Sequence, residues 1–597
     1  MTRSFVVATS GHVDHGKSTL VRALTGIEPD RWDEERRRGL TIDLGFAWTD
    51  LPSGRRLAFV DVPGHERFLG NMLAGLGPAP VVLFVVAADQ GWQPQSSDHL
   101  AAAAALGIRH GVVALARTDL ASAEQLAAAS AEIRERLAPT GLAAAPIVPV
   151  SARTGAGLDA LRAALDDVLA TVPPADDAAP VRLWIDRSFS IAGAGTVVTG
   201  TLSAGRIARG DAFELGDGHR VEVRGIQSRG ERLDEAVGVQ RVALNLRGIP
   251  VEAAGRGDAL LSPGAWHRTA TVDARRVSGA ALDDLPEQLI VHVGSAAVPA
   301  HLRPFGPDHV RLRLERPLPL RLGDRMVLRD PGGRSVVGGV QLLDVDPPVL
   351  RRRGAGTRRA AELERLDPAG DLAHEVSRRG AAPADALARL GLAVDDPLPD
   401  GLLRVGDWLV AKPALADWAR RLRTAVTADA ERDPLSPGLT RDAAVDALRL
   451  PDARLAGAVV RLARLEVVAG RIRMPGAAAS LGAAERGVAE LERRLGERPF
   501  AAPEADDLAA LRLGPKELAA AERVGRLVRI ADGVVLRPDA PARAARELAR
   551  LPQPFTASEA RQALGTTRRV AIPLLELLDR RGLTRRLPDT RREVVRD

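Results

Sequence analysis

A short segment near the N-terminus has the residue types and spacing needed to bind the phosphates of a nucleotide. The sequence GHVDHGKS at 11–18 fits the pattern G-x-x-x-x-G-K-[ST] and follows the β-branched run FVVAT. Glycines let the backbone N–H groups of such a loop converge on phosphates at a helix N-terminus. Lys17 can reach the β- and γ-phosphates, and the Ser18 hydroxyl can coordinate Mg²⁺. A chance glycine-rich turn is the alternative, and the strand–loop–helix context argues against it.

The loop is expected to bind phosphate through a contiguous set of residues. The set comprises Asp14, His15, Gly16, Lys17, Ser18 and Thr19. The side chains of His12 and His15 are assigned no chemistry of their own.

A second motif, DVPGH at 61–65, ends the apolar run LAFVDV. Asp61 can hold Mg²⁺ through water, and Gly64 can offer its N–H to the γ-phosphate. His65 then lies where a side chain could orient the attacking water, an effect worth ~10²–10⁴ in rate. The alternative is a histidine that only caps the following helix.

The segment RGLTI at 38–42 lies between these motifs in a charged loop. Thr41 can complete the Mg²⁺ shell only when the γ-phosphate is present, which would make this loop a switch. The predicted metal ligands are therefore Ser18, Thr41 and Asp61.

The choice of base depends on Asp119, which follows the apolar run GVVALA. A carboxylate there can accept both N1–H and N2–H of guanine, which adenine does not offer. Ser151 and Ala152 follow the run PIVPV and place a backbone N–H near guanine O6. A site with these hydrogen bonds rejects the wrong base strongly. The sequence therefore predicts a GTPase that binds GTP and GDP.

Two changes of pattern divide the chain into three regions. Residues 1–172 alternate buried β-branched runs with helical segments, which is typical of a doubly wound α/β domain. Residues 181–350 have short alternating strands punctuated by Gly, which favours two small β-barrels that meet near Trp266. Beyond 351 the chain is helical, with four spaced hairpin signals that indicate tandem winged-helix modules.

The predicted architecture is therefore multidomain. It comprises a P-loop GTPase domain (1–175), β-barrels at 176–265 and 266–350, and winged-helix modules at 351–420, 421–480, 481–540 and 541–597.

Composition limits the classes of function. The 597 residues include no cysteine, which excludes disulfides, thiolate metal sites and cysteine catalysis. No apolar run approaches ~20 residues, so we expect a soluble cytoplasmic protein without membrane contact. The net charge of +6 resides in the arginine-rich C-terminal part, because residues 1–350 are slightly acidic. A basic tail suggests a polyanionic partner, and compositional drift is the alternative.

The nucleotide motifs resemble those of the EF-Tu class of translational GTPases. GHVDHGKS, RGLTI, DVPGH and SAR occur in the order and spacing of that class, and the likeness extends over roughly residues 1–350. The guanine motif departs from it, since the usual Asn-Lys-x-Asp reads Ala-Arg-Thr-Asp at 116–119. An amide that braces the phosphate loop is thereby lost. Arg117 can still lie over the base, so we expect weaker nucleotide affinity without loss of specificity.

Longer segments resemble the bacterial selenocysteine-specific elongation factors. These are RGLTIDLGF, WIDRSFSIAGAGTVVTGT and FTASEARQALGTTRRVAIPLLELLDRRGLTRR. The resemblance implies a monomer that delivers selenocysteinyl-tRNA to the ribosome at recoded UGA codons. It also implies that the C-terminal winged helices bind an mRNA hairpin.

Charge at the expected aminoacyl pocket agrees with this resemblance. In EF-Tu-like proteins the position of Arg187 is acidic and that of Arg241 is a neutral amide, whereas both are cationic here. A selenol ionises more readily than a thiol, whose pKa is ~8.5, so a selenolate would pair with these guanidiniums. Asp186 and, less certainly, Arg247 complete the predicted pocket. Ordinary surface arginines are the alternative.

The last module carries the predicted RNA contacts. They comprise Thr566, Thr567, Arg568 and Arg569 at the start of a recognition helix, and Arg585 and Arg586 in the wing. Hydroxyls and guanidiniums there can contact RNA phosphates and an extruded base. A solvated charged face is the alternative, and RRRGAGTRR at 351–359 is interpreted as a basic linker.

Two other functions fit much of this pattern. One is an ordinary or stress-related translational GTPase whose tail binds ribosomal RNA. The other is a winged-helix nucleic-acid-binding regulator in which the GTPase is only a slow switch. The paired Arg187 and Arg241 argue against both.

Overall fold

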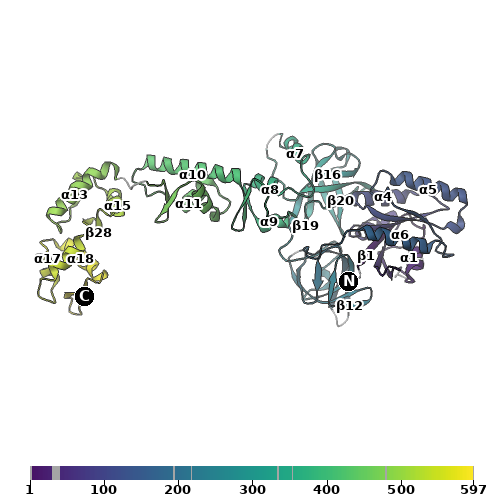
Figure 1. The fold of residues 1–597 in the computed structure, drawn as a ribbon, viewed down its shortest axis with the longest axis horizontal. Helices are drawn as coiled ribbons and strands as arrows, with labels where there is room; N and C mark the ends of the chain where they lie inside the picture. Colours follow the sequence, from purple (N-terminus) through teal and green to yellow (C-terminus); the bar gives the residue numbers. More distant parts are fainter. Residues whose placement is uncertain are drawn as a thin grey trace. The chain divides into compact units, whose positions relative to one another are not determined.

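The computed structural model describes residues 3–29, 41–191, 195–216, 218–332, 335–351, 354–476 and 481–595 (Figure 1). It contains two compact units. The first comprises Met1–His374 and Pro383–Leu398, and the second comprises Glu375–Ala382 and Pro399–Asp597.

A six-stranded sheet of order β2-β3-β1-β4-β5-β6 forms the centre of the N-terminal domain. Every residue of β4, VVLFVVA, is buried, as expected for a parallel strand covered on both faces. The strands are β1 (Ser4–Ser10), β2 (Gly45–Asp50), β3 (Arg56–Asp61), β4 (Val81–Ala87), β5 (His110–Ala116) and β6 (Ile147–Pro149), with β2 antiparallel to β3.

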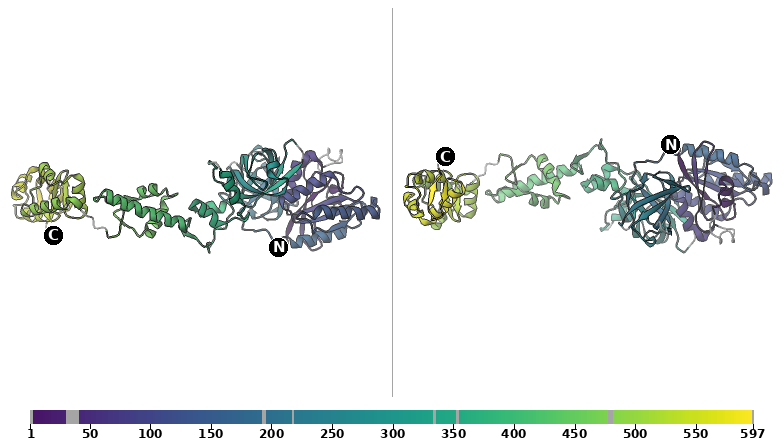
Figure 2. Two further views of the ribbon diagram at one scale, coloured as in Figure 1. Left: turned by 90° about the horizontal axis from the view of Figure 1, so that it is seen from above. Right: turned by 90° about the horizontal axis from the view of Figure 1, so that it is seen from below.

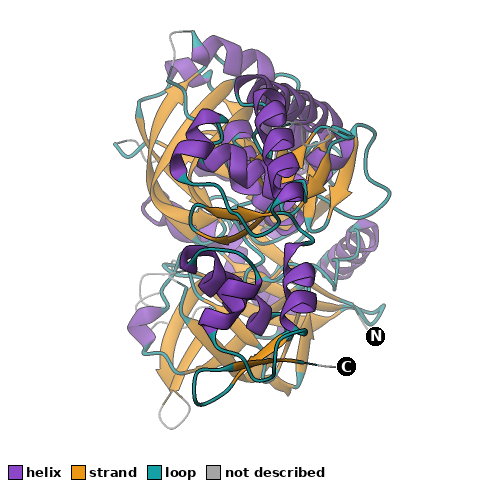
Figure 3. Ribbon diagram, turned by 90° about the vertical axis from the view of Figure 1, so that its left-hand side faces the viewer, coloured by secondary structure: helices purple, strands orange, loops and turns teal. Residues whose placement is uncertain are grey.

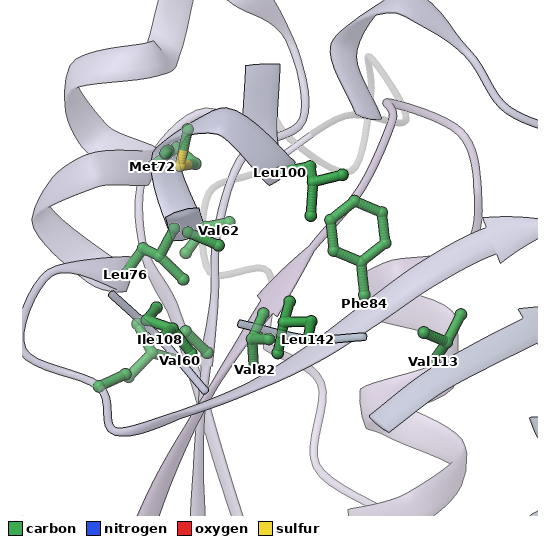
Figure 4. Close-up of a cluster of buried hydrophobic side chains, with 14 of the residues drawn as sticks. Val60, Val62, Met72, Leu76, Val82, Phe84, Leu100, Ile108, Val113 and Leu142 are labelled. Atoms are coloured by element: carbon green, nitrogen blue, oxygen red, sulfur yellow. The ribbon is translucent and has the colours of Figure 1, made fainter. Parts of the chain in front are cut away.

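Helices cover both faces of this sheet. On one face pack α1 (Lys17–Thr25) and α6 (Leu158–Thr171), and on the other α3 (Leu69–Leu76), α4 (Pro94–Leu106) and α5 (Ala123–Leu137). Figure 4 shows the second core, where Phe84 and Val82 of β4 lie with Met72 and Leu100. This doubly wound arrangement brings the loops that follow β1, β3, β5 and β6 to one edge of the sheet, where α/β proteins bind ligands.

The first barrel is a closed ring of order β10-β15-β7-β8-β14-β11, with β12 on its edge. Its strands are β7 (Arg182–Ile191), β8 (Gly195–Leu202), β10 (Ala212–Glu214), β11 (Arg220–Ser228), β12 (Glu231–Leu233), β14 (Gln240–Arg247) and β15 (Ala259–Leu261). The short strands β9 (Arg206–Ala208) and β13 (Glu235–Val237) pair separately.

The second barrel is closed in the order β16-β19-β18-β17-β20-β21. Figure 2 draws this part of the chain in teal, and Figure 3 draws the strands in orange. Its strands are β16 (Arg268–Gly279), β17 (Gln288–Val293), β18 (Ala296–Pro304), β19 (His309–Pro319), β20 (Arg325–Arg329) and β21 (Val336–Asp344). Helix α4 packs on this barrel so closely that a Cβ at Gly339 would lie 2.4 Å from the Cβ of Ala105. Both predicted barrels are therefore confirmed.

Helix α7 (Ala355–Leu363) is fixed to the second barrel by a buried ion network. Arg359 donates to Asp273 at 2.7 Å and pairs with Asp344, and Arg311 donates to Asp273 from the other side. The side chain of Arg359 is 1% exposed. The interpretation of 351–359 as a basic linker is thus corrected at this residue, which is a structural anchor; residues 352–353 lie outside the described residues.

The rest of the described chain alternates groups of helices with two-stranded wings, in agreement with the predicted tandem winged-helix modules, and the division into four modules stays a prediction. The helices are α8 (Leu372–Arg379), α9 (Ala384–Arg389), α10 (Lys412–Arg432), α11 (Arg441–Leu448), α12 (Ala456–Leu462), α13 (Glu485–Glu497), α14 (Ala505–Ala510), α15 (Pro515–Arg523), α16 (Ala540–Leu548), α17 (Ala557–Ala563) and α18 (Arg568–Arg580). The strands are β22 (Ala381–Pro383), β23 (Leu402–Val405), β24 (Trp408–Ala411), β25 (Leu439–Thr440), β26 (Glu466–Val468), β27 (Arg471–Arg473), β28 (Val528–Ala531), β29 (Val534–Leu536), β30 (Thr584–Arg586) and β31 (Arg592–Val594).

The exact module boundaries stay a prediction. Among the described residues, no helix is both long and apolar enough to cross a membrane.

Candidate functional site

The phosphate-binding loop connects β1 to α1 and is closed by its lysine. Lys17 Nζ donates to the carbonyl oxygens of Gly11 at 3.0 Å and His12 at 2.8 Å. Gly16, the N-cap residue of α1, has φ 86°, a conformation that favours glycine. A Cβ at Gly64 would lie 2.5 Å from the backbone nitrogen of Val13, so only glycine fits where this backbone approaches the loop.

The three predicted Mg²⁺ ligands converge. Ser18 Oγ donates to Asp61 Oδ2 at 2.6 Å and lies 2.9 Å from Thr41 Oγ1, while Thr9 Oγ1 donates to the other carboxylate oxygen at 2.6 Å. Two hydroxyls and one carboxylate suit Mg²⁺ completed by nucleotide phosphates and water. The described residues hold no cluster of three or more His, Cys, Asp or Glu that would bind a metal unaided. The first part of RGLTI, 38–40, lies outside the described residues.

His65 caps the short helix η1 (Glu66–Phe68). Its Nδ1 accepts the N–H of Arg67 at 3.2 Å, and its ring lies against Phe68. The structure thus shows the capping arrangement that we gave as the alternative, and the catalytic role of His65 stays a prediction.

A buried histidine that the sequence analysis missed supports the loop. His99 of α4 accepts the N–H of Gly11 through Nδ1 at 3.0 Å. Burial and the nearby Lys17 lower the pKa of His99 to about 3, and burial lowers that of His15 to about 4. Both rings are therefore neutral at pH 7. A single His in an alanine-rich helix gave no signal of this contact.

The predicted guanine-binding residues are assembled after β5 and β6. Asp119 Oδ1 accepts from Ser151 Oγ at 2.6 Å, and this bond lowers the pKa of Asp119. The carboxylate is thereby kept charged for the guanine N1–H and N2–H groups. Ser151 N–H donates to the Ala156 carbonyl, so the N–H of Ala152 is the better candidate for guanine O6.

Arg117 spans from the guanine motif to the phosphate loop. Its Nη2 donates to the carbonyl oxygen of Asp14, and its Nη1 lies 3.7 Å from Asp89. The bracing contact that we expected to be lost with the missing amide is therefore made by a guanidinium.

The predicted aminoacyl residues on the first barrel form an ionic cluster with the GTPase domain. Arg241 donates to both oxygens of Asp186, at 2.5 and 2.8 Å, and its guanidinium lies 3.5 Å from the ring centroid of Phe46. Arg187 donates through Nη2 to Asp43 Oδ2 at 2.8 Å. Arg256, which sequence reasoning missed, donates to Asp43 Oδ1 at 2.6 Å.

Arg247 does not join this cluster. It lies at the other end of β14, about 20 Å along the strand from Arg241. Its nearest carboxylate is Glu222 at 3.7 Å, and its side chain is 68% exposed.

A groove of about 750 Å³ lies on the same barrel. Phe189 and Ile191 line it from β7, and they lie on the same face of that strand as Arg187. Ala243 and Asn245 line it from β14 and share a face with Arg241. The groove and the arginine cluster are therefore neighbouring parts of one barrel face.

The predicted RNA contacts fall into two groups. Thr566 donates to the Phe500 carbonyl at 2.5 Å and Arg569 to the Pro503 carbonyl at 2.6 Å, so both join the last module to the preceding one. The outward group is exposed and comprises Thr567 and Arg568 at the start of α18, and Arg585 and Arg586 in the wing, with Arg585 paired to Glu593.

Three family models match the chain. They are the elongation factor Tu GTP-binding domain over 2–171, the selenocysteine-specific elongation factor β-barrel domain over 275–349, and the elongation factor SelB winged helix over 546–592. Fold, guanine site and the first of these models define a translational GTPase, an enzyme that binds GTP and GDP.

Matches to full-length proteins specify the kind of translational GTPase. The chain is 32% identical over 606 residues to the selenocysteine-specific elongation factor of Escherichia coli (strain K12), covering 97% of both chains. It is 38% identical over 387 residues to that of Desulfomicrobium baculatum, covering 61% of each. A crystal structure of a bacterial selenocysteine-specific elongation factor matches all of both chains, with a TM-score of 0.78 and 26% identity. The chain belongs to the family of selenocysteine-specific elongation factors (SelB).

Proposed function

We propose that this protein, bound to GTP, delivers selenocysteinyl-tRNA to the ribosome at recoded UGA codons. It acts in the cytoplasm as a monomer, and its C-terminal modules tether it to an mRNA hairpin. The family membership and the winged-helix match at 546–592 support this proposal.

The nucleotide site supplies the switch. Mg²⁺ would be held by Ser18, Asp61 and Thr41, the last only while the γ-phosphate is present. Gly64 would sense the same phosphate, and ribosome contact would move His65 from its capping position to orient water for hydrolysis.

The charge of the ionic cluster is the observation that carries the choice of amino acid. Among the described residues, three guanidiniums (Arg187, Arg241 and Arg256) face two carboxylates (Asp43 and Asp186). A selenolate would complete the charge balance. A neutral serine or cysteine side chain would leave one half-buried cation without an anion, which disfavours binding.

Arg187 is the better candidate to contact selenium. Both oxygens of Asp186 already bind Arg241, whose side chain is 12% exposed. Arg187 donates only through Nη2, to Asp43 and Leu44, and is 21% exposed. Its Nε and Nη1 make no hydrogen bond to the described residues and can turn to the ligand.

The groove beside the cluster suits the 3′ end of the tRNA. Exposed Phe189 and Ile191 can stack on a base, and Arg209, Arg224 and Arg232 in its lining can approach phosphates. An aminoacyl ester bound there would place its side chain toward Arg187.

The test measures how well the protein protects the aminoacyl ester from hydrolysis in excess GTP or GDP. Selenocysteinyl-tRNA is compared with seryl-tRNA on the same tRNA body. We expect protection of the selenocysteinyl ester only, and only with GTP. In Arg187→Asp the preference should fall, while the exposed control Arg247→Asp should keep it. Equal protection of both esters by the unaltered protein would refute the charge argument.

A further inference from the structure

Arg256 touches three parts of the molecule at once. Its Nε donates to the Asp186 backbone carbonyl at 2.8 Å, Nη1 to Asn71 Oδ1 at 2.5 Å and Nη2 to Asp43 Oδ1 at 2.6 Å. Asp186 belongs to the first barrel, Asn71 to α3, and Asp43 follows Thr41 in the predicted switch. A planar guanidinium fixes the directions of all three bonds, which an ammonium does not.

Two segments that are predicted to respond to the bound nucleotide are hydrogen-bonded to Arg256. One follows Thr41 and the other follows Gly64. Thr41 Oγ1 lies 2.9 Å from the Mg²⁺ ligand Ser18, and Asp43 is only two residues further on. Asn71 donates to the Ile42 carbonyl at 2.8 Å, so α3, which follows Gly64 and His65, is joined to the same segment. A displacement of either segment must therefore change the bonds of Arg256.

Asp43 connects the same switch to the amino-acid cluster. Its Oδ1 accepts from Arg256 and its Oδ2 from Arg187. Its carboxylate is therefore the charged group shared by the switch and the residue that would contact selenium.

We propose that Arg256 is a positioning residue which, through Asp43 and Asn71, makes the arrangement of the selenocysteine cluster depend on the bound nucleotide. With GTP and Mg²⁺ bound, Thr41 would remain beside Ser18, and Asp43 would keep Arg187 next to Asp186. With GDP, Thr41 and Asp43 would be released from these positions, and Arg187 and the β7 backbone would lose their hydrogen bonds to Asp43 and Arg256. This inference rests on the proposed function for its tRNA readout.

The experiment uses the full-length protein with Arg256→Lys and Asp43→Asn. Arg316→Lys is the matched control, because Arg316 donates to the carbonyl of Gly257, next in the chain to Arg256, and contacts no switch residue among the described residues. The ratio of selenocysteinyl-ester protection in GTP to that in GDP should fall about tenfold or more in both test variants, in the usual range of coupling between sites. GTP and GDP affinities should change less than about twofold, since Arg256 contacts no predicted nucleotide-binding residue in the described part of the chain.

Hydrogen exchange gives a readout that needs no tRNA. In the unaltered protein and in Arg316→Lys, amides of 183–191 and 255–258 should exchange more slowly with GTP than with GDP. In Arg256→Lys and Asp43→Asn this nucleotide-dependent difference should vanish. A difference that persists in both test variants would overturn the inference. If the exchange result holds and the ester is not protected by the unaltered protein, the coupling stands and the proposed tRNA function fails.

Discussion

At the scale of single residues, the guanine motif shows how one side chain replaces another. The sequence lacks the amide at 116, yet Arg117 bonds the Asp14 carbonyl and so braces the phosphate loop from the same strand end. Arg117 has φ 58°, and this turn aims its side chain back toward the loop. Charge-assisted hydrogen bonds are the stronger kind, so this contact is a real substitute for the amide.

We expect Arg117→Ala to release GDP and GTP about tenfold faster, the effect of losing one bond of a charged donor at a partly exposed site. Arg117→Lys should lose less, because an ammonium can still reach one carbonyl. Stopped-flow dissociation of a fluorescent nucleotide measures this. Release by the alanine variant at the unaltered rate would show that the contact does not brace the loop.

The neutral His99 makes the GTPase domain sensitive to acid. Its folded pKa of about 3 lies below the ordinary 6.5, so the unfolded state takes up the proton first. The free energy of unfolding should therefore be constant above pH 6.5 and fall as the pH decreases toward 3, by about 2 kcal/mol per such histidine at pH 5.

His99→Gln removes this titration and keeps an acceptor for the Gly11 N–H. Hydrogen exchange of the β1 amides measures the free energy of opening at pH 7 and at pH 5. Between these pH values it should decrease by about 2 kcal/mol less in His99→Gln than in the unaltered protein. Equal falls in the two proteins would contradict the assignment.

At the scale of elements, α7 depends on ions and not on apolar packing alone. Burial lowers the pKa of Arg359, and Asp344 and Asp273 raise it by a larger amount, so the guanidinium stays charged in the barrel wall. Removing one partner of such a network leaves a carboxylate buried without its counter-ion, which is far costlier than losing a surface pair.

Arg359→Ala should therefore destabilise the second barrel by about 3–5 kcal/mol. Arg358→Ala, at the exposed neighbouring position, should change stability by less than about 0.5 kcal/mol. Hydrogen exchange of β16 and β21 in the full chain gives both values. A loss below about 1 kcal/mol in Arg359→Ala would show that the network does not anchor α7.

At the scale of the whole molecule, the predicted nucleotide site lies in the first compact unit and the predicted mRNA-hairpin contacts lie in the second. Variants of one unit should therefore leave the other function intact. Within the last modules, the outward arginines differ in role from Arg569, which is tied to the preceding module.

Arg568→Ala combined with Arg586→Ala should weaken binding of an RNA hairpin that follows an in-frame UGA codon of the same genome. The slope of log Kd against log salt should fall by about 1 for each phosphate contact removed. Arg546→Ala on α16 is the control, since its guanidinium donates within its own helix. GTP affinity should not change, and a matching loss of GTP binding would indicate misfolding instead.

Local spacing was sufficient for the main architecture. The α/β domain, the two barrels and the winged modules were predicted from the periodicity of apolar residues along short segments. That periodicity depends only on residues close together in the chain. The same holds for Asp61, Asp119 and Ser151, which lie at or just after the ends of buried parallel strands, and for Ser18 at the start of the helix that follows β1. The carboxyl ends of these strands meet at one edge of the sheet.

By itself, therefore, the sequence determined the class of fold, the nucleotide and the family. Only the tertiary structure decided which residues distant in the chain meet: Asp43 with Arg187 and Arg256, His99 with Gly11, and Arg359 with Asp273. The tertiary structure also shows that Arg247 lies outside the cluster, and that Thr566 and Arg569 contact the preceding module. The reason is that these contacts join residues far apart in the chain, and their geometry is set by barrel closure and domain packing, which no local pattern encodes.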